Sequence, residues 1–212
     1  MTALRVLEPG IFASIQDLGR PGLRRYGIPT SGGMDRYSLR LANLLVGNPE
    51  DSACLEVTLG GTALEAMGDT VVAVTGADLS PKLNEGEMPQ WEAIRIKRGD
   101  RIRFTTPRRG CRSYLSIVGG FETPICLGSR SSYSRSKLGQ VESRILTRGE
   151  ELTSSKYKLS IEEIVGRRVE SSLIPRILER PTVDIIFARE DRGLFPDESF
   201  DYLTKSVYTV ST

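Results

Sequence analysis

The sequence contains no histidine among its 212 residues. This absence excludes Ser-His-Asp and Cys-His catalysis, and histidine-containing zinc sites, within the polypeptide. It also excludes an imidazole group that shuttles protons at neutral pH. Any chemistry must therefore rest on carboxylates, lysine, arginine, hydroxyls and backbone amides.

Cysteine is scarce as well. The three cysteines, Cys54, Cys111 and Cys126, form no Cys-x-x-Cys pair. An odd number argues against a disulfide framework, so we expect each thiol to behave as a small buried apolar group. The sequence also lacks a Gly-x-x-x-x-Gly-Lys-Ser/Thr loop, so a nucleotide site would be of another kind.

Charge and hydropathy exclude two further classes. The net charge is only +2, and the charges are mixed along the chain, so no nucleic-acid partner is expected. No apolar run is long enough to span a membrane, and the first residues lack the apolar core of a signal peptide. We therefore expect a cytoplasmic protein without a membrane partner. The best basic patch, residues 108–112, predicts a turn with a candidate anion site.

Two early turns combine many glycines with charge. Residues 16–22 read Gln-Asp-Leu-Gly-Arg-Pro-Gly, and residues 31–36 read Ser-Gly-Gly-Met-Asp-Arg. Glycine lets such loops fold tightly, and charged, structured loops often carry function. The alternative is a pair of tight turns in which Asp17 and Arg20 satisfy one another.

The N-terminal two thirds of the chain predict short strands separated by turns. Residues 70–74 form a β-branched run that suits a buried strand, and residues 113–118 suit another strand before Gly119-Gly120. Residues 94–97 and 102–104 alternate apolar and charged positions around Arg98-Gly99-Asp100, which predicts a hairpin. Many short strands punctuated by glycine favour a barrel or a sandwich.

One segment, residues 36–46, predicts a helix instead. Its apolar positions at helical spacing are Tyr37, Leu41, Leu44 and Leu45. Asp35 suits the N-cap, while Gly47 and Pro49 suit the end of the helix. The free amides at the N-terminus and the helix dipole could hold an anion, and the alternative is that Asp35 only caps them.

The composition changes beyond residue 149. Ser160 and Glu163 match a capping box, which predicts a short helix from Ile161. Residues 183–187 and 207–210 suit strands, and Asp197 suits a helix cap. The predicted division is a first β domain at 1–152, a linker with a short helix at 153–181, and a partial second β domain at 182–212.

The glycine-rich turns belong to a longer series of motifs. The series comprises residues 6–10, 15–22, 31–35, 42–48, 55–61, 112–115, 119–120 and 127–131. In this order the motifs resemble the biotin-dependent carboxyltransferase-like family, which includes the C subunit of 5-oxoprolinase, KipA, the second subunit of allophanate hydrolase and part of urea amidolyase. So many linked motifs are far more specific than any single glycine loop.

The resemblance implies a mainly β fold: a cyclophilin-like β-barrel with one short helix, and the start of a second, incomplete barrel. It implies a homologous partner, the B-type or KipI-like protein. In the 5-oxoprolinase members, the B and C subunits act with a third subunit to open 5-oxoproline to glutamate with ATP hydrolysis. This chain contains no biotinyl-lysine context, so biotin is not expected on it.

The chain departs from the family pattern at two places. Residues 132–140 read Ser-Tyr-Ser-Arg-Ser-Lys-Leu-Gly-Gln, where relatives usually carry a glycine-rich stretch. Relatives also continue well past the position at which this sequence stops. We expect a truncated or split protein, or a sheet edge that another chain completes.

Opening the ring of 5-oxoproline requires an activated amide, which ATP can supply by phosphorylating the carbonyl oxygen. Phosphoryl transfer depends on neutralising charge with arginine, lysine and backbone amides, usually with magnesium, so we expect ATP and magnesium through the complex. The candidate catalytic residues are Asp17, Gln16 and Arg20. The candidate substrate- or nucleotide-binding residues are Asp35, Asn43, Asn48, Arg112, Ser129, Arg130 and Ser131. The metal ligands stay unassigned.

Each candidate has a role and an alternative. Asp17 could hold a metal or orient a substrate amine, and Arg20 or Arg130 could clamp a carboxylate or phosphate, unless each arginine lies on a solvated face. Glu56 lies on a predicted strand, where an inward carboxylate is costly unless it is paired, so it is either functional or outward-facing. We expect both early turns to fold against the bend at 129–131 and to form one polar cavity on the barrel rim.

Three functions remain open. The chain could be a subunit of an ATP-dependent 5-oxoprolinase that acts on a small-molecule substrate and is inactive alone. It could be a regulatory protein that antagonises a KipI-like kinase inhibitor. It could also be the carboxyltransferase component of a urea amidolyase-type system.

Overall fold

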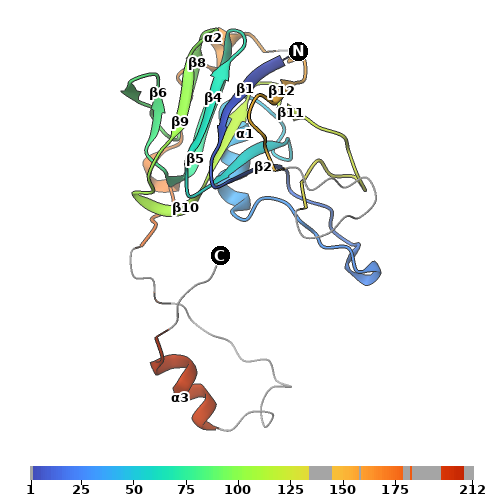
Figure 1. Cartoon of the computed structure of the whole chain (residues 1–212), viewed down its shortest axis with the longest axis vertical. Coiled ribbons are helices and arrows are strands. Elements are labelled where there is room, and N and C mark those ends of the chain that lie inside the picture. The colour runs from blue at the N-terminus through green and yellow to red at the C-terminus, as the bar shows by residue number, and fades with distance from the viewer. Residues whose placement is uncertain (1, 134–144, 158, 179–181, 183–196, 208–212) are drawn as a thin grey trace. The chain divides into compact units, whose positions relative to one another are not determined.

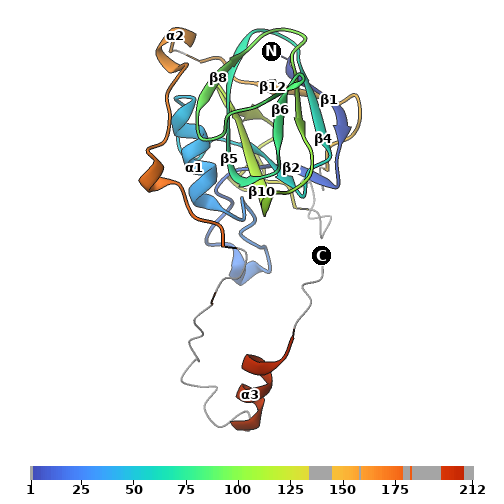
Figure 2. The same cartoon turned by 90° about the vertical axis from the view of Figure 1, so that its left-hand side faces the viewer.

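The computed structural model describes residues 2–133, 145–157, 159–178, 182 and 197–207. The contacts divide the chain into two units, Met1–Ile177 and Leu178–Thr212. Two antiparallel sheets build the first unit (Figures 1 and 2), which confirms the mainly β prediction. The strand predicted at 183–187 lies outside the described residues. So does the strand predicted at 207–210, except for residue 207. The predicted domain boundaries stay a prediction.

Sheet A has seven strands in the order β11-β12-β1-β4-β9-β6-β7, and sheet B has five in the order β2-β3-β10-β5-β8. In sheet A the bounds are β1 Thr2–Pro9, β4 Thr62–Ala66, β6 Pro81–Leu83, β7 Gly86–Glu87, β9 Arg101–Phe104, β11 Phe121–Glu122 and β12 Glu151–Ser154. In sheet B they are β2 Phe12–Gln16, β3 Cys54–Thr58, β5 Thr70–Asp78, β8 Ala93–Ile96 and β10 Arg109–Ile117. The helices are α1 Arg36–Leu45, α2 Ile161–Ile164 and α3 Asp197–Lys205, with 3-10 turns η1 Arg24–Tyr26 and η2 Ser171–Leu173.

The predicted hairpin between residues 94–97 and 102–104 is wrong. β8 pairs with β5 in sheet B, whereas β9 pairs with β4 and β6 in sheet A. The turn between them carries the chain from one sheet to the other. Gly99 donates to the carbonyl of Ala66, and Ala66 donates back to the carbonyl of Asp100, so β4 holds the turn, which the Asp100 amide also closes by donating to the Lys97 carbonyl.

The two faces of sheet B differ in polarity, because side chains alternate along each strand. One face contributes to the main hydrophobic core, with Ala13, Ile15, Leu55, Val57, Leu115 and Ile117. The other face carries buried polar groups between apolar ones, namely Ser14, Gln16, Glu56, Tyr114 and Ser116. Helix α1 packs on this second face against β3, β5 and β10 (Figure 2).

Local chemistry sets the ends of α1. Asp35 accepts a hydrogen bond from the Ser38 amide at 3.0 Å, which confirms it as the N-cap. Gly47, with φ of 74°, follows the last turn in the left-handed conformation. The buried side, however, carries Ser38, Leu39, Ala42, Asn43 and Leu45, whereas Tyr37 and Leu44 are exposed.

The segment after β12 that contains α2 belongs to the first unit. The capping box predicted at Ser160 and Glu163 is observed, with α2 starting at Ile161. Ile164 is fully buried in a second apolar cluster with Leu45 and Val71. In the second unit, α3 starts at Asp197, where a helix was predicted.

Candidate functional site

Asp17 lies at the centre of a buried hydrogen-bond network. Its carboxylate accepts from the Gly19 amide at 2.7 Å, the Ser129 hydroxyl at 2.6 Å, the Arg130 amide at 2.6 Å and the Ser131 hydroxyl. Its own amide donates to Ser131 Oγ at 2.9 Å. The first turn and the bend at 129–131 are therefore joined through one carboxylate.

Arg20 ties the second turn to the same network. Its guanidinium donates to Ser31 Oγ at 3.0 Å and to the carbonyls of Ser131 and Cys126. It is only 3% exposed, so it is not on a solvated face. Asp17 and Arg20 both bond to Ser131, Asp17 at its hydroxyl and Arg20 at its carbonyl, and no described contact joins the two side chains to each other.

The prediction that the three polar segments meet is confirmed, because Gly33 also donates to the Asp17 carbonyl. The Arg130 guanidinium donates to the Thr123 carbonyl. The charged groups of the two early turns and of the bend at 129–131 are therefore hydrogen-bonded within the fold. Their observed role is to hold these loops together. A ligand cavity among them stays a prediction.

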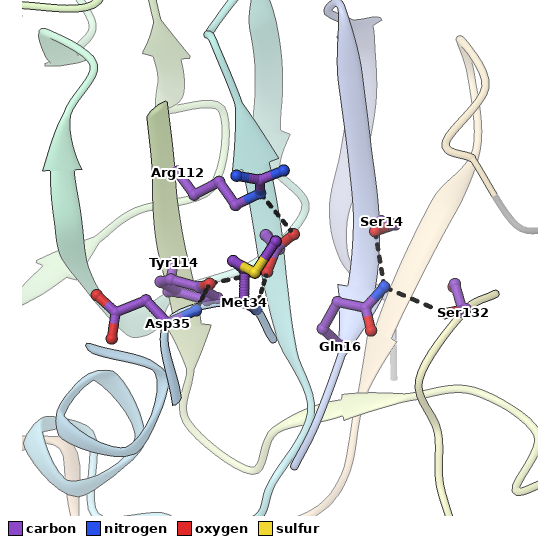
Figure 3. Close-up of polar contacts among 8 residues, drawn as sticks. Ser14, Gln16, Met34, Asp35, Arg112, Tyr114 and Ser132 are labelled. Atoms are coloured by element: carbon purple, nitrogen blue, oxygen red, sulfur yellow. Dashed lines mark hydrogen bonds and ion pairs between the residues drawn. The ribbon is translucent and has the colours of Figure 1, made fainter. Parts of the chain in front are cut away.

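A second polar centre surrounds Glu56 on the α1 face of sheet B, and its partners Met34, Arg112 and Tyr114 are labelled in Figure 3. Glu56 is 6% exposed, so it is an inward carboxylate. Its Oε2 accepts from the Tyr114 hydroxyl at 2.8 Å and the Met34 amide at 2.9 Å. Its Oε1 lies 3.5 Å from Arg112 Nε. This carboxylate is therefore paired, as the cost of burying it requires.

Arg112 and Tyr114 differ in what they can still bind. The Arg112 side chain is 35% exposed, and its one described ion pair is through Nε to Glu56. Tyr114 is fully buried, donates to Glu56 and accepts from the Asp35 amide at 2.7 Å. Burial, and then the negative charge of Glu56, raise the pKa of Tyr114 well above its ordinary value. Tyr114 therefore stays a neutral donor, whereas Arg112 can reach an anion.

Asn43 and Asn48 hold α1 to sheet B. Asn43 donates to the Ser52 carbonyl at 2.7 Å and accepts from Ser116 Oγ at 2.7 Å. Asn48 donates to the Ile117 carbonyl at 2.8 Å and accepts from the Gly119 amide at 2.8 Å. Their polar atoms are occupied inside the fold, and no contact tests the predicted ligand role.

Replacing Asn48 by alanine is expected to lower the free energy of unfolding by about 2 kcal/mol, because the buried Gly119 amide loses its acceptor. Urea unfolding followed by circular dichroism measures this change. A variant as stable as the parent but unable to bind substrate would contradict the structural role.

Cys54 illustrates how closed this face is. Burial raises the pKa of its thiol from 9.0 to about 12. Because the thiolate is the reactive form, we expect Ellman's reagent at pH 8 to modify the exposed Cys111 and to leave Cys54 unmodified until the protein unfolds. Modification of Cys54 in the native protein, read by peptide mass spectrometry, would contradict this expectation.

Tyr114 was not among the candidate site residues predicted from the sequence. For Glu56 the sequence left open whether it is functional or faces outward. A usable signal existed, since Arg112 and Tyr114 are two residues apart on β10 and so share a face. The register then places Tyr114 opposite Glu56, and Glu56 opposite Ser14. That register spans three strands distant in sequence.

Neither a metal ligand set nor a spanning helix is found in the part of the chain that the structure describes. No three Cys, Asp or Glu side chains there form a group that could hold a metal ion. No helix there is both long and apolar enough to cross a bilayer.

The fold and these motifs are those of carboxyltransferase domains. A family model described as "Carboxyltransferase domain, subdomain A and B" matches residues 26–212, so the chain belongs to this family. Its similarity to the C subunit of 5-oxoprolinase and to urea amidolyase confirms the resemblance inferred from the motifs.

Three relatives illustrate the similarity. Urea amidolyase of Saccharomyces cerevisiae is 39% identical over 84% of this chain and 10% of its own length. The 5-oxoprolinase C subunit of Escherichia coli is 36% identical over 77% of this chain and 53% of its own length. The crystal structure of Kluyveromyces lactis urea carboxylase is 41% identical, with a TM-score of 0.75, over 84% of this chain and 16% of that one. The chain thus spans about half or less of these proteins.

Proposed function

We propose that this chain is a subunit of an ATP-dependent 5-oxoprolinase that opens 5-oxoproline to glutamate. The observation that carries this choice is Arg112, a partly exposed guanidinium held by the buried Glu56. A guanidinium suits a substrate that carries a carboxylate, as 5-oxoproline does. The similarity to the 5-oxoprolinase C subunits of Escherichia coli and Haemophilus influenzae supports the same choice.

In this proposal the substrate carboxylate pairs with the free edge of the Arg112 guanidinium. Glu56 fixes the guanidinium through Nε, and Tyr114 and the Met34 amide fix Glu56 in turn. This preorganisation lowers the entropy lost when the substrate binds. We propose that ATP and magnesium are bound through the complex; among the described residues, no group of three Cys, Asp or Glu side chains could hold a metal ion.

The proposal extends to the assembly. A homologous B-type or KipI-like subunit and a third subunit would complete a cytoplasmic hetero-oligomer, and the chain alone would be inactive. We also propose that the two sheets close into a cyclophilin-like barrel. The support for a multi-subunit enzyme is the word "subunit" in the names of two relatives.

A second candidate is a carboxyltransferase component that acts with a biotin carrier on another chain. The identities of 39% and 41% to urea amidolyase and urea carboxylase favour it. Urea itself is neutral, so in this candidate the carboxylate that Arg112 binds would be that of carboxybiotin or of the carboxylated product.

Reconstitution tests the proposal. The chain is mixed with its B-type and third subunits, and glutamate release from 5-oxoproline is measured with and without ATP. We expect glutamate only when all subunits and ATP are present. Activity that requires carboxybiotin would support the second candidate, and tight binding of the B-type subunit without turnover would support a regulatory role.

A further inference from the structure

Residues 20–30 form an arm that projects from the two sheets. Its tip is the 3-10 turn η1, and both views draw this blue segment beyond the strands (Figures 1 and 2). Leu23 and Ile28, on either side of the tip, are half-buried, whereas every residue of η1 is exposed. The arm therefore presents Arg24, Arg25 and Tyr26 to the surroundings of the protein.

The tip of the arm is internally ordered. The Tyr26 amide donates to the Leu23 carbonyl at 2.9 Å, and the Gly27 amide donates to the Arg24 carbonyl at 2.9 Å. Gly27, with φ of 73°, has the left-handed conformation that ends the turn. The Arg25 guanidinium lies over the Tyr26 ring, 4.7 Å from its centre, which is a cation–π contact. The tip thus presents a cation and an aromatic ring as one preformed unit.

The base of the arm is anchored by the buried charges of the first polar network. The Arg20 amide donates to the Thr30 carbonyl at 2.7 Å and so joins the two ends of the arm. Gly19 lies so close to the carbonyls of Thr30 and Ser31 that a Cβ atom there would clash with them. The Arg20 guanidinium also donates to Ser31 Oγ, and the Asp17 carboxylate accepts from the Gly19 amide. The arm therefore cannot pivot freely on the sheets.

Gln16 extends this anchor on β2. Its amide nitrogen donates to Ser14 Oγ at 3.0 Å and to the Ser132 carbonyl at 3.3 Å (Figure 3). The Ser132 amide donates in turn to the Ile15 carbonyl at 3.0 Å. The strand that leads into the arm is thus bonded to the segment that follows the bend at 129–131.

This anchor is more elaborate than a surface turn needs. Asp17 is 8% exposed and Arg20 is 3% exposed, and burying such charges is costly unless their hydrogen bonds are made. What the buried network adds is a fixed position for the arm. A loop that is already fixed loses less conformational entropy when it binds a partner.

The arm carries positive charge without a neighbouring acid. Residues 18–34 contain three arginines and no aspartate or glutamate. In the part of the chain that the structure describes, ion pairs hold other arginines, such as Arg5 and Arg95, and none includes Arg24 or Arg25. Exposed guanidinium groups bind carboxylates through paired hydrogen bonds. Arginine and tyrosine are also the residues that often supply the binding energy of protein–protein interfaces.

We propose that the arm at residues 20–30 binds an acidic surface of another protein chain, with Arg24 and Arg25 paired to its carboxylates and Tyr26 packed against it. A nucleic acid fits less well, because the net charge of the chain is only +2 and two arginines neutralise few phosphates. For the identity of the partner, this inference rests on the proposed function, in which the B-type and third subunits are the candidates. The arm then serves assembly and not the chemical step.

The test measures binding of the full chain to each of these two subunits by titration calorimetry, at about 50 mM and about 300 mM sodium chloride. We expect one of them to bind the parent, and to bind the double variant Arg24→Ala/Arg25→Ala about 100-fold more weakly. The parent should lose affinity as the salt concentration rises, and the double variant should lose less, because salt screens the arginine charges. Tyr26→Ala should bind about 10-fold more weakly and keep the salt dependence of the parent.

Arg98→Ala/Arg103→Ala is the matched control. Both arginines are exposed, and neither takes part in an ion pair with the described residues. This variant removes the same charge away from the arm and should bind like the parent. Because η1 is exposed, the arm variants should unfold at the urea midpoint of the parent. Equal binding by the parent and the folded Arg24→Ala/Arg25→Ala variant would overturn the inference.

The outcomes separate this inference from the proposed function. If the arm is needed for assembly but the complex releases no glutamate from 5-oxoproline with ATP, the arm keeps its role and the proposed function fails. If the complex releases glutamate and its assembly is insensitive to the arm variants, the reverse holds. The inference also fails if neither subunit binds the parent, or if the arm binds polyuridylate instead of either subunit.

Discussion

Asp17→Asn is expected to lower the free energy of unfolding of the first unit by about 3 kcal/mol. The carboxylate of Asp17 accepts from two amides and two hydroxyls in a buried site. An amide side chain offers one acceptor atom in place of two, and its NH₂ group would face groups that also donate. The loss therefore combines broken hydrogen bonds with unpaired buried donors.

Urea unfolding of the full chain, followed by circular dichroism, measures this loss. Asp51→Asn is the matched control, because Asp51 is exposed and should change stability by less than about 0.5 kcal/mol. If both variants unfold at the same urea concentration, Asp17 does not hold the loops together. That result would favour a catalytic role for Asp17, because a carboxylate used in catalysis need not stabilise the fold.

The sequence was most informative where structure depends on local chemistry. The helix predicted at residues 36–46 agrees with α1, which ends at Leu45. The agreement is close because the cap at Asp35 and the glycine at 47 each act over one turn. The capping box at Ser160 predicted α2 for the same reason. The meeting of the early turns with residues 129–131 came from the order of the family motifs, which locality alone would not reveal.

The sequence was least informative where distant strands choose their partners. The segments around Arg98-Gly99-Asp100 have the pattern of a hairpin, yet β8 pairs with β5 and β9 pairs with β4, so the two segments lie in different sheets. The apolar spacing that predicted α1 does not identify its buried side, because sheet B offers the helix polar partners: Thr75 donates to the Ser38 carbonyl, and Ser116 donates to Asn43. An apolar pattern cannot identify a helix face that is buried against polar groups.

The same limit applies to the site. The charged, glycine-rich turns were the strongest sequence signal for a functional site. In the structure, their polar groups bond mainly to one another. Among the sequence-based candidates, Gln16 Oε1 and the guanidinium of Arg112 keep unused hydrogen-bonding capacity within the described residues. What distinguishes them from Asp17 or Asn48 is the number of partners each finds in the folded chain, which only the register and packing decide.

Arg112→Ala is expected to raise KM for 5-oxoproline about 100-fold in the reconstituted complex and to change kcat much less. The reason is that a charge-assisted bond to the substrate carboxylate is made in the ground state and the transition state alike, so its loss weakens uniform binding. Because removing Arg112 also leaves the buried Glu56 without its ion pair, we expect the unfolding midpoint to fall, and the variant is assayed under conditions in which it stays folded. Initial rates of glutamate release over a range of 5-oxoproline concentrations provide both constants.

Two variants make this prediction specific. Arg112→Lys keeps the charge but loses the planar pair of donors, so we expect it to recover only part of the affinity, with KM about 10-fold above the parent. Arg109→Ala removes an exposed arginine from the same strand and should leave KM unchanged. An unchanged KM in Arg112→Ala, with kcat reduced and the fold intact, would show that Arg112 acts on the chemical step. The carboxylate of the substrate would then have to be bound elsewhere in the complex.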